Sequence, residues 1–326
     1  MLDNGEVHFA DEASIQNADE ITGQTIRFYA VWLPDMHIIW PYELSAVYGQ
    51  TLSDIWFSDD FHSTIPGTVN WAAPGDSVGN VGTHLHTMIF TPDDLVNFSV
   101  ETQDVGITVY PRYVEISGNP GRTLIPFDSE DTLFGKTSTL EISLNGLLDG
   151  DAVTLAISEG YGLSLSGNTG IGNNAKRTVT VSYDGITTIN ESGPVSLELY
   201  ISGNDNYILD NASGFELGIL DGQAESRAIP VTQANIAAFN TYANTGTGLA
   251  RYYKLAQNIT LNPPAAGQSN WTAIGTSESQ FTGSFDGNGF TISNLTINSA
   301  AAYQAVSAEA LIPTALLVQA VLYGTA

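Results

Sequence analysis

Cysteine is absent from the 326-residue chain, and basic residues are scarce. The lack of cysteine excludes disulfide scaffolds, thiolate metal sites and cysteine nucleophiles. Only 9 lysine and arginine residues stand against 35 aspartate and glutamate residues, which gives a net charge of -26. Nucleic acids and anionic membranes are repelled by such a surface, so we expect neither as a partner.

Familiar catalytic and targeting signals are also missing. The chain has no G-x-S-x-G elbow, no Walker loop, no G-x-G-x-x-G between a strand and a helix, and no H-E-x-x-H. Its first 20 residues lack the basic and apolar regions of a signal peptide. The apolar tail at 310–326 contains Pro313 and falls short of the roughly 20 residues that span a bilayer. We therefore identify no catalytic residue and expect no membrane insertion by this segment.

The chain does carry a strong pattern of β structure. Hydrophobic residues make up 43% of it, enough for folded cores, and its length favours more than one domain. One helix is predicted over 232–243, with Ile236, Phe239 and Ala243 on its apolar stripe and Thr232 as its N-cap. The fold class is predicted to be all-β. Alternating or β-branched runs between turn residues predict strands at 25–33, 86–90, 104–110, 138–144, 151–158, 177–183 and 195–201.

Residues 48–109 carry a recognisable set of motifs. "YGQTLSDIWFSDDF" is followed by "GTVNWAAPGDSVGNVGTHLHTMIFTPDDLVNFSVETQDVGITV". The stretch resembles the Ig-like repeat of large bacterial surface proteins, and the resemblance implies a small β-sandwich. The residues agree with it, since Trp71 and Phe90 supply aromatic side chains for a core. Phe98 is expected to enter the last strand beside the core residues Val105, Ile107 and Val109.

Two further stretches resemble repeat modules. "FADEASIQNADEITGQTIRFYAVWLP" (9–34) is similar to the closing half of the Listeria-Bacteroides repeat, so we expect the chain to begin inside a module. Residues 111–221 are interpreted as a second Ig-like module, because "NDNYILDNASGFELGIL" repeats the asparagine-aromatic step and closing strand of "DLVNFSVETQDVGITV".

The C-terminal third resembles the first coils of adhesin-like right-handed β-helices. "ARYYKLAQNITLN" (250–262) and "NWTAIGTSESQFTGSFDGNGFTISNLTIN" (270–298) follow that pattern, except that Ala273 stands where proline is usual. The resemblance implies inward Phe290, Ile292, Leu295 and Ile297. The Asp-Gly-Asn-Gly run at 286–289 is predicted to form a corner, because glycine and asparagine tolerate positive φ. The helix is expected to lie before the first rung and cover the open end of the core.

The end of the chain departs from this pattern. After Ile297 the sequence becomes rich in alanine and leucine and nearly free of glycine. We expect a truncated or frameshifted solenoid there, and a helix that replaces the missing cap is the alternative.

Acidic turns and histidines are the remaining candidates for sites. Asp286 in the corner, the pair Asp149 and Asp151, and the pair Asp205 and Asp210 are interpreted as turn residues, with calcium binding as the alternative. His84 and His86 lie two apart on a predicted strand and share a face. Zinc binding there requires a third ligand, which His62 or the pair Asp59 and Asp60 would have to supply. A polar, solvent-facing stripe is the simpler interpretation.

The sequence thus predicts a non-enzymatic segment of a secreted or surface-displayed bacterial protein. We assign no catalytic, cofactor-binding or metal-binding residue, and expect a glycan or an extracellular protein as the partner of a solenoid presented by Ig-like spacers. A fragment of a carbohydrate-active β-helix enzyme, either a polysaccharide lyase or a hydrolase, is the alternative. The expected units are a β-repeat remnant (1–37), an Ig-like sandwich (38–110), a second Ig-like sandwich (111–221) and a capping helix with a truncated β-helix start (222–326).

Overall fold

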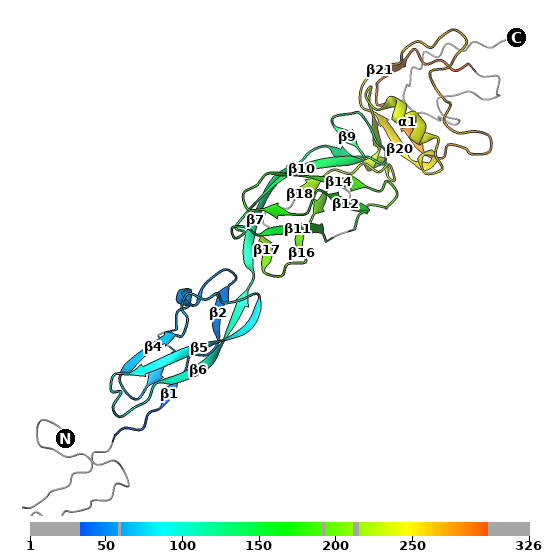
Figure 1. Cartoon of the computed structure of the whole chain (residues 1–326). Coiled ribbons are helices and arrows are strands. Elements are labelled where there is room, and N and C mark those ends of the chain that lie inside the picture. The colour runs from blue at the N-terminus through cyan, green and yellow to red at the C-terminus, as the bar shows by residue number, and fades with distance from the viewer. Residues whose placement is uncertain (1–32, 58–59, 159, 191–192, 211–214, 299–326) are drawn as a thin grey trace, which may run out of the picture.

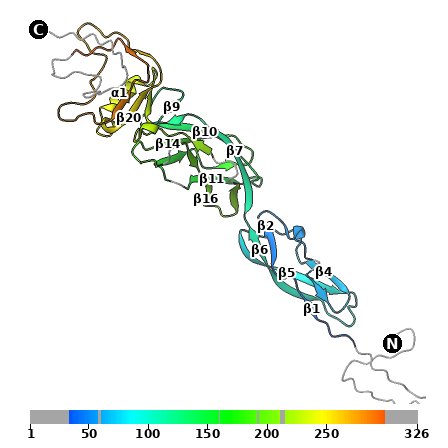
Figure 2. The ribbon, with the colours of Figure 1, turned by 180° about the vertical axis from the view of Figure 1, so that it is seen from behind.

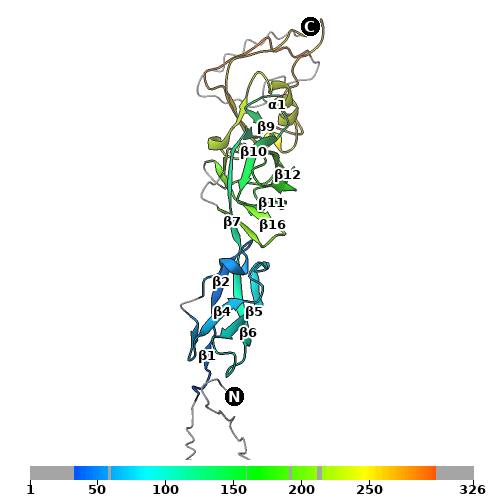
Figure 3. The ribbon, with the colours of Figure 1, turned by 60° about the vertical axis from the view of Figure 1, so that its left-hand side comes forward.

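The chain forms an elongated row of β structure. Three stretches follow one another along one long axis in Figure 1: residues 38–110, 111–221 and 222–298, which we call the N-terminal, central and C-terminal parts. The views in Figure 2 and Figure 3 show the same arrangement. The computed structural model describes residues 33–57, 60–158, 160–190, 193–210 and 215–298. Within these ranges strands far outnumber helices, so the predicted all-β class is confirmed.

Several predictions fall outside the described residues. The expected strand at 25–33 and the resemblance at 9–34 lie almost entirely before the first described residue, Leu33. The apolar tail and the expected truncation after Ile297 lie beyond residue 298. Asp59, one of the proposed zinc ligands, also lies outside.

The N-terminal part is built on one four-stranded sheet in the order β2-β6-β5-β4, with β2 parallel to β6 and the other pairs antiparallel. The predicted strands at 86–90 and 104–110 lie within β5 and β6. Trp71, Phe90, Val105, Ile107 and Val109 are buried, as predicted. Its elements are β1 (Ile38–Ile39), β2 (Leu44–Val47), η2 (Leu52–Asp54), β3 (His62–Ser63), β4 (Gly67–Trp71), β5 (Gly82–Pro92) and β6 (Glu101–Tyr110).

The prediction for Phe98 is wrong. Phe98 lies three residues before β6 begins, in a turn where its N–H donates to the carbonyl of Asp94 at 3.2 Å. Its side chain is only partly buried. Asp94 fixes this turn by accepting bonds from the N–H groups of Val96 and Asn97, and this local bonding keeps Phe98 out of the strand.

The central part contains the largest hydrophobic core. A five-stranded sheet, β12-β14-β10-β7-β17, lies against the smaller sheets β13-β11-β16 and β15-β18. The predicted strands at 138–144, 151–158 and 177–183 correspond to β10, β11 and β14. The strands are β7 (Arg112–Pro120), β8 (Thr123–Leu124), β9 (Phe134–Gly135), β10 (Thr137–Asn145), β11 (Ala152–Ile157), β12 (Leu163–Ser166), β13 (Ile171–Gly172), β14 (Arg177–Tyr183), β15 (Val195–Leu197), β16 (Leu199–Ser202), β17 (Tyr207–Asp210) and β18 (Phe215–Leu217).

The single strand predicted at 195–201 is two strands. β15 pairs with β18, whereas β16 pairs with β11, and Glu198 separates the two. The carbonyl of Glu198 accepts the N–H of Ser158 at 2.9 Å. The run therefore passes from one small sheet to another, a change of partner that alternation of apolar residues cannot reveal.

The C-terminal part stacks strands in parallel, in the order β19-β20-β22, with a second parallel pair, β21 and β23. Side-chain bonds from Asn288 to Leu255 O, from Thr291 N to Asn258 and from Asn294 to Leu261 O each join residues 33 positions apart. Asparagine side chains thus form hydrogen bonds between successive turns of the chain. The elements are η3 (Glu225–Arg227), β19 (Ile229–Val231), α1 (Ile236–Ala243), η4 (Gly248–Ala250), β20 (Tyr252–Leu255), β21 (Ile259–Thr260), β22 (Ser284–Asp286) and β23 (Ile292–Ser293).

The predicted helix exists, but it begins later than expected and follows a strand in the chain. Ile236, Phe239 and Ala243 are its buried residues, as predicted. Its N-cap is Asn235 rather than Thr232, and these two residues exchange bonds between side chain and backbone N–H that form a turn before the helix. β19 precedes α1 in the chain and pairs in parallel with β20, so the helix follows the first strand of this sheet instead of preceding it. Its expected role as a cover for the open end of the core stays a prediction.

The Asp-Gly-Asn-Gly corner has the predicted geometry. Asn288 has φ of 48° and Gly289 has φ of 76°, both in the left-handed region. The carboxylate of Asp286 accepts the N–H of Asn288 at 2.8 Å and lies 3.6 Å from the Lys254 ammonium. Ile292 and Leu295 are buried, while Phe290 and Ile297 are partly buried against the same core. The inward pattern predicted for this stretch is therefore confirmed.

One aromatic residue ties the N-terminal and central parts together. Tyr48 packs against both hydrophobic cores, and its ring meets Tyr207 edge to face at 5.3 Å between centroids. Asn206 adds polar contacts: its side chain accepts the N–H of Val81 at 2.9 Å and donates to the Asn80 side chain at 3.2 Å. We call these contacts the first junction.

The central and C-terminal parts contribute side chains to one hydrophobic core. Ile125 and Phe127, from the segment between β8 and β9, are buried in the hydrophobic core of the C-terminal part. The Phe127 ring lies 5.1 Å from that of Tyr242 in α1. The hydroxyl of Thr232 donates to the buried Asp131 carboxylate of the same segment. We call this the second junction.

Candidate functional site

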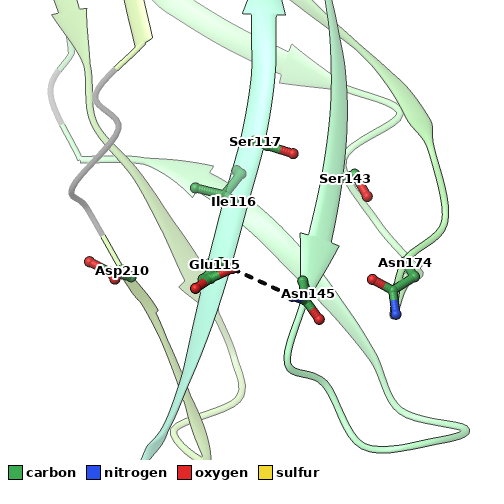
Figure 4. Close-up of a pocket in the computed structure, with 7 residues that line it drawn as sticks. All are labelled: Glu115, Ile116, Ser117, Ser143, Asn145, Asn174 and Asp210. Carbon is green, nitrogen blue, oxygen red and sulfur yellow. Dashed lines mark hydrogen bonds between the residues drawn. The ribbon is translucent and has the colours of Figure 1, made fainter.

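A cavity lies on the outer face of the five-stranded sheet, across β10, β7 and β17. Its volume is about 450 Å³. Its lining is almost entirely polar and comes from three strands and the loop between β13 and β14. The lining residues, shown in Figure 4, are Glu115, Ile116, Ser117, Ser143, Asn145, Asn174 and Asp210.

The local sequence explains why polar groups gather there. Successive side chains on a strand point to opposite faces, so a strand with one buried face alternates. In β7, Val114 and Ile116 are buried, and the intervening Tyr113, Glu115 and Ser117 face outward. β10 and β17 alternate in the same way, with buried Leu144 and Leu209 next to the exposed ends of their strands. The cavity is therefore the solvent side of a sheet whose other side faces the main core.

Strand register sets the side chains in rows. Glu115 is the direct partner of Asn145 on β10 and of Asp210 on β17, and Ser117 is the partner of Ser143. Directly paired residues share one face of a sheet, so their side chains are neighbours. The Asn145 amide donates to the Glu115 carboxylate at 3.4 Å, and Figure 4 shows Glu115 between Asn145 and Asp210.

A turn of defined geometry brings Asn174 to the same place. The N–H of Asn174 donates to the carbonyl of Leu144 at 2.6 Å, and its φ of 54° is left-handed. The neighbouring Asn173 side chain accepts the N–H groups of Gly146 and Leu147 at 3.0 and 3.2 Å, which holds the turn after β10. The loop and the strand end are thus held together, and the cavity wall is preorganised.

Apolar side chains form the next row of the face. Tyr113 is 71% exposed and Ile208 is 43% exposed, and the two are register partners on β7 and β17. They stand two residues from Glu115 and Asp210, respectively. Large apolar side chains that neighbour one another at the surface are a feature of binding surfaces. The face therefore offers an aromatic platform beside a polar cavity.

The residues singled out in the sequence are mostly placed elsewhere. His84 and His86 are partly buried, and their Nε2 atoms lie 2.7 Å from Asn80 O and 3.2 Å from Val78 O. His62 is in β3, paired with Ile39. Within the part of the chain that the structure describes, no three His, Asp or Glu side chains group as metal ligands.

Two of the acidic turn residues, Asp151 and Asp286, bond to protein groups. Asp151 accepts a short bond of 2.5 Å from the Tyr207 hydroxyl, and Asp149 is exposed in the same turn. Asp205 is exposed in the turn before β17. Asp210 reaches the cavity, whereas sequence analysis grouped it with Asp205. The sequence did not single out Glu115, Asn145 or Asn174. The alternation of buried and exposed positions in residues 112–117 is the signal that could have indicated Glu115.

Among the residues with described structure, no helix is long and apolar enough to cross a bilayer.

Comparison with known proteins places the chain only loosely. No protein-family model and no curated protein matches it. The chain is similar to the D00-D0 domain of intimin, at 12% identity over 56% of this chain and 97% of that chain, with a TM-score of 0.20. It is also similar to domains 4-9 of the surface layer protein SbsC, at 12% identity over 57% of this chain and 30% of that chain, with a TM-score of 0.19. At these TM-scores the similarity assigns no ligand and no activity.

Proposed function

We propose that this chain is a non-enzymatic segment of a secreted or surface-displayed bacterial protein, in which a row of β modules holds a binding surface at a distance from its anchor. The cysteine-free, strongly acidic composition is compatible with an extracellular setting. The elongated arrangement of the three parts is what a spacer needs.

The finer form of the proposal names the modules. The N-terminal and central parts are Ig-like β-sandwiches, and the C-terminal part is the beginning of a right-handed parallel β-helix. The motifs at 48–109 and 250–298 support this, as do the parallel pairs of β20 with β22 and of β21 with β23. The bonds between residues 33 positions apart match the repeated coils of a solenoid.

The observation that carries the proposal is the first junction. β6 ends at Tyr110 and β7 begins at Arg112, so a single residue links the two parts. Such a link leaves few geometries open, and Tyr48 fills the space beside it by packing on both cores. Domain pairs without a sizeable interface usually move relative to one another. The built contact here supports a spacer that resists bending.

Small-angle scattering on the full chain tests the spacer. A compact globule of this length has a radius of gyration of about 20 Å, so a stiff row of modules should give a clearly larger value with the scattering profile of a folded protein. The Tyr48→Ala variant should broaden the distribution of distances by freeing the first junction. A radius near the compact value, or a broad distribution that Tyr48→Ala leaves unchanged, would contradict the spacer.

Enzymatic activity is tested by a panel of polysaccharides. We expect no cleavage, because the sequence lacks the catalytic motifs named earlier, and the about two solenoid turns among the described residues are too few for the long groove of β-helix lyases and hydrolases. Release of reducing ends or unsaturated products from a pectin or alginate-type polymer would overturn this proposal in favour of the carbohydrate-active enzyme.

A further inference from the structure

We infer that the face of β7, β10 and β17 binds an uncharged glycan, with Tyr113 as the stacking platform and Glu115, Asn145 and Asn174 as hydrogen-bonding groups. This inference rests on the proposed function, because it supplies the ligand that the spacer would display. It also moves the binding surface from the solenoid, where sequence analysis placed it, to the central part.

The size and preorganisation of the cavity fit a small ligand. A volume of about 450 Å³ lies within the range of ligand pockets, roughly 300 to 1,000 Å³. The strand register fixes Asn145 beside Glu115, and backbone bonds to Asn173 and from Asn174 fix the loop. Fixed side chains lose little entropy on binding, so even a shallow polar site can hold a ligand.

The chemical inventory of the cavity selects a polyhydroxylated ligand. Carboxylates accept hydrogen bonds, side-chain amides both donate and accept them, and serine hydroxyls do either. The hydroxyl groups of a sugar also do either, so they can satisfy all three kinds of partner. A purely apolar ligand would leave these polar groups without water or a bonding partner, which costs free energy.

Tyr113 and Ile208 add an apolar contact surface beside the polar cavity. One face of a sugar ring carries C–H groups, and an exposed tyrosine ring is a flat, amphipathic surface against which such a face can pack. Tyr113 lies on the same strand face as Glu115, two residues away, and Ile208 extends the apolar surface on β17. A sugar whose hydroxyls reach Glu115 and Asn145 therefore has an apolar neighbour for its ring.

Charge decides which glycans are accepted. Glu115 and Asp210 place two carboxylates in the cavity, and the whole chain has a net charge of -26. Uronic acids, sialic acids and sulfated sugars would meet like charges, which is unfavourable. Calcium prefers six to eight oxygen ligands, and no group of three acidic or histidine side chains suited to a metal occurs in the described ranges. Among glycans, the uncharged ones are therefore favoured.

Binding is measured with the full chain by titration calorimetry against maltotriose, cellotriose and chitotriose as neutral probes. Trigalacturonate and spermidine serve as the acidic and the cationic probe. We expect at least one neutral probe to bind, with affinity maintained in a chelator, and no binding of trigalacturonate. Tyr113→Ala and Asn145→Ala should each weaken it by about tenfold or more.

Matched variants separate the site from general effects. Tyr200→Ala removes an exposed tyrosine from β16 in another sheet, and Asn119→Ala removes an exposed amide from β7 beyond the cavity. Both should bind as the unmodified chain does. Absence of binding to every neutral probe, binding unchanged by Tyr113→Ala and Asn145→Ala, or a preference for spermidine or trigalacturonate would overturn the inference. A stiff, elongated chain that binds no sugar contradicts the site alone, whereas a flexible chain that binds sugar contradicts the spacer alone.

Discussion

The two junctions join neighbouring parts in different ways. At the first junction, contact is made by a few single side chains, among them Tyr48, Asn206 and Leu148, which lies against Gly49. At the second, the central part sends Ile125 and Phe127 into the core of the C-terminal part, and both are buried there. The first junction is a contact between two parts that each have their own hydrophobic core. The second is one hydrophobic core made from two parts of the chain.

This difference determines how the parts should respond to damage. Apolar burial stabilises by roughly 25 cal/mol per Å² and is lost when the contributing segment leaves. The C-terminal part therefore depends on the segment between β8 and β9, while the N-terminal part depends on the central part much less. Arg122 strengthens the second junction by donating to the carbonyls of Asp131 and Thr137, which holds that segment in place.

Replacing Phe127 should have the largest effect. Phe127→Ala removes a buried ring at the shared core, and such changes cost about 3 to 5 kcal/mol. Hydrogen exchange, followed peptide by peptide, should show weaker protection in both the segment around β8 and β9 and the C-terminal part around β20.

Phe90→Ala is the matched control for that experiment. Phe90 is fully buried in the N-terminal part, so the same chemical change should reduce protection there and leave β20 unchanged. If Phe127→Ala affected only its own segment, the two parts would be independent and the shared core would be wrong.

The main strands and the helix could be predicted from the sequence, whereas the contacts between the parts could not. The strands at β10, β11 and β14 and the inward residues of α1 follow from apolar periodicity, which depends on local neighbours alone. Phe127 lies in the segment between β8 and β9, and its ring packs against Tyr242, more than a hundred residues later. No local pattern encodes such a contact.

The candidate site shows the same division. The alternation of buried Val114 and Ile116 with exposed neighbours marks a strand with one polar face. What brings Asn145 and Asp210 beside Glu115 is the pairing of β7 with β10 and with β17, and the second of these pairs is parallel. Parallel partners are distant in sequence, so their register is set by the whole fold.

Replacing Tyr207 should lower the stability by less than replacing Phe127. The loss should depend on pH, which distinguishes the hydroxyl of Tyr207 from its ring. Its hydroxyl donates to Asp151 and accepts the N–H of Leu148. Burial, and then the bond to Asp151, raises the pKa of Tyr207 from 10.0 to about 12. A raised pKa means that the neutral phenol is favoured in the folded state. The stability that the neutral Tyr207 phenol contributes to the folded state is therefore complete below pH 10 and is lost as the pH rises from 10 to 12.

Tyr207→Phe tests this linkage. Loss of a hydrogen bond to a charged partner should cost about 1.5 to 3 kcal/mol at neutral pH. In calorimetric scans, the difference in unfolding temperature between the unmodified chain and Tyr207→Phe should be constant up to pH 9 and shrink between pH 10 and 12. Tyr200→Phe, at an exposed tyrosine, should show no such difference at any pH. A difference that stayed constant to pH 12 would mean that folding does not raise the pKa of the Tyr207 hydroxyl.

The smallest effect is expected at Asn206, and it isolates the polar half of the first junction. Asn206→Ala removes the acceptor of the Val81 N–H and the donor to Asn80, while the Asn206 carbonyl still accepts the N–H of Arg112. Neutral hydrogen bonds at a partly exposed site contribute about 1 kcal/mol. The Val81 amide should lose its protection from exchange, with the strands on either side unaffected.

Asn204→Ala is the control, because the Asn204 side chain accepts the N–H of Asn206 within the same turn. It should loosen the turn before β17 and leave the Val81 amide protected. If Asn206→Ala exposes Val81 without changing the scattering profile, Tyr48 alone holds the two parts in line. If the profile broadens as it does in Tyr48→Ala, the amide contacts are needed as well, because one aromatic contact permits rotation about its own axis and a second contact beside it does not.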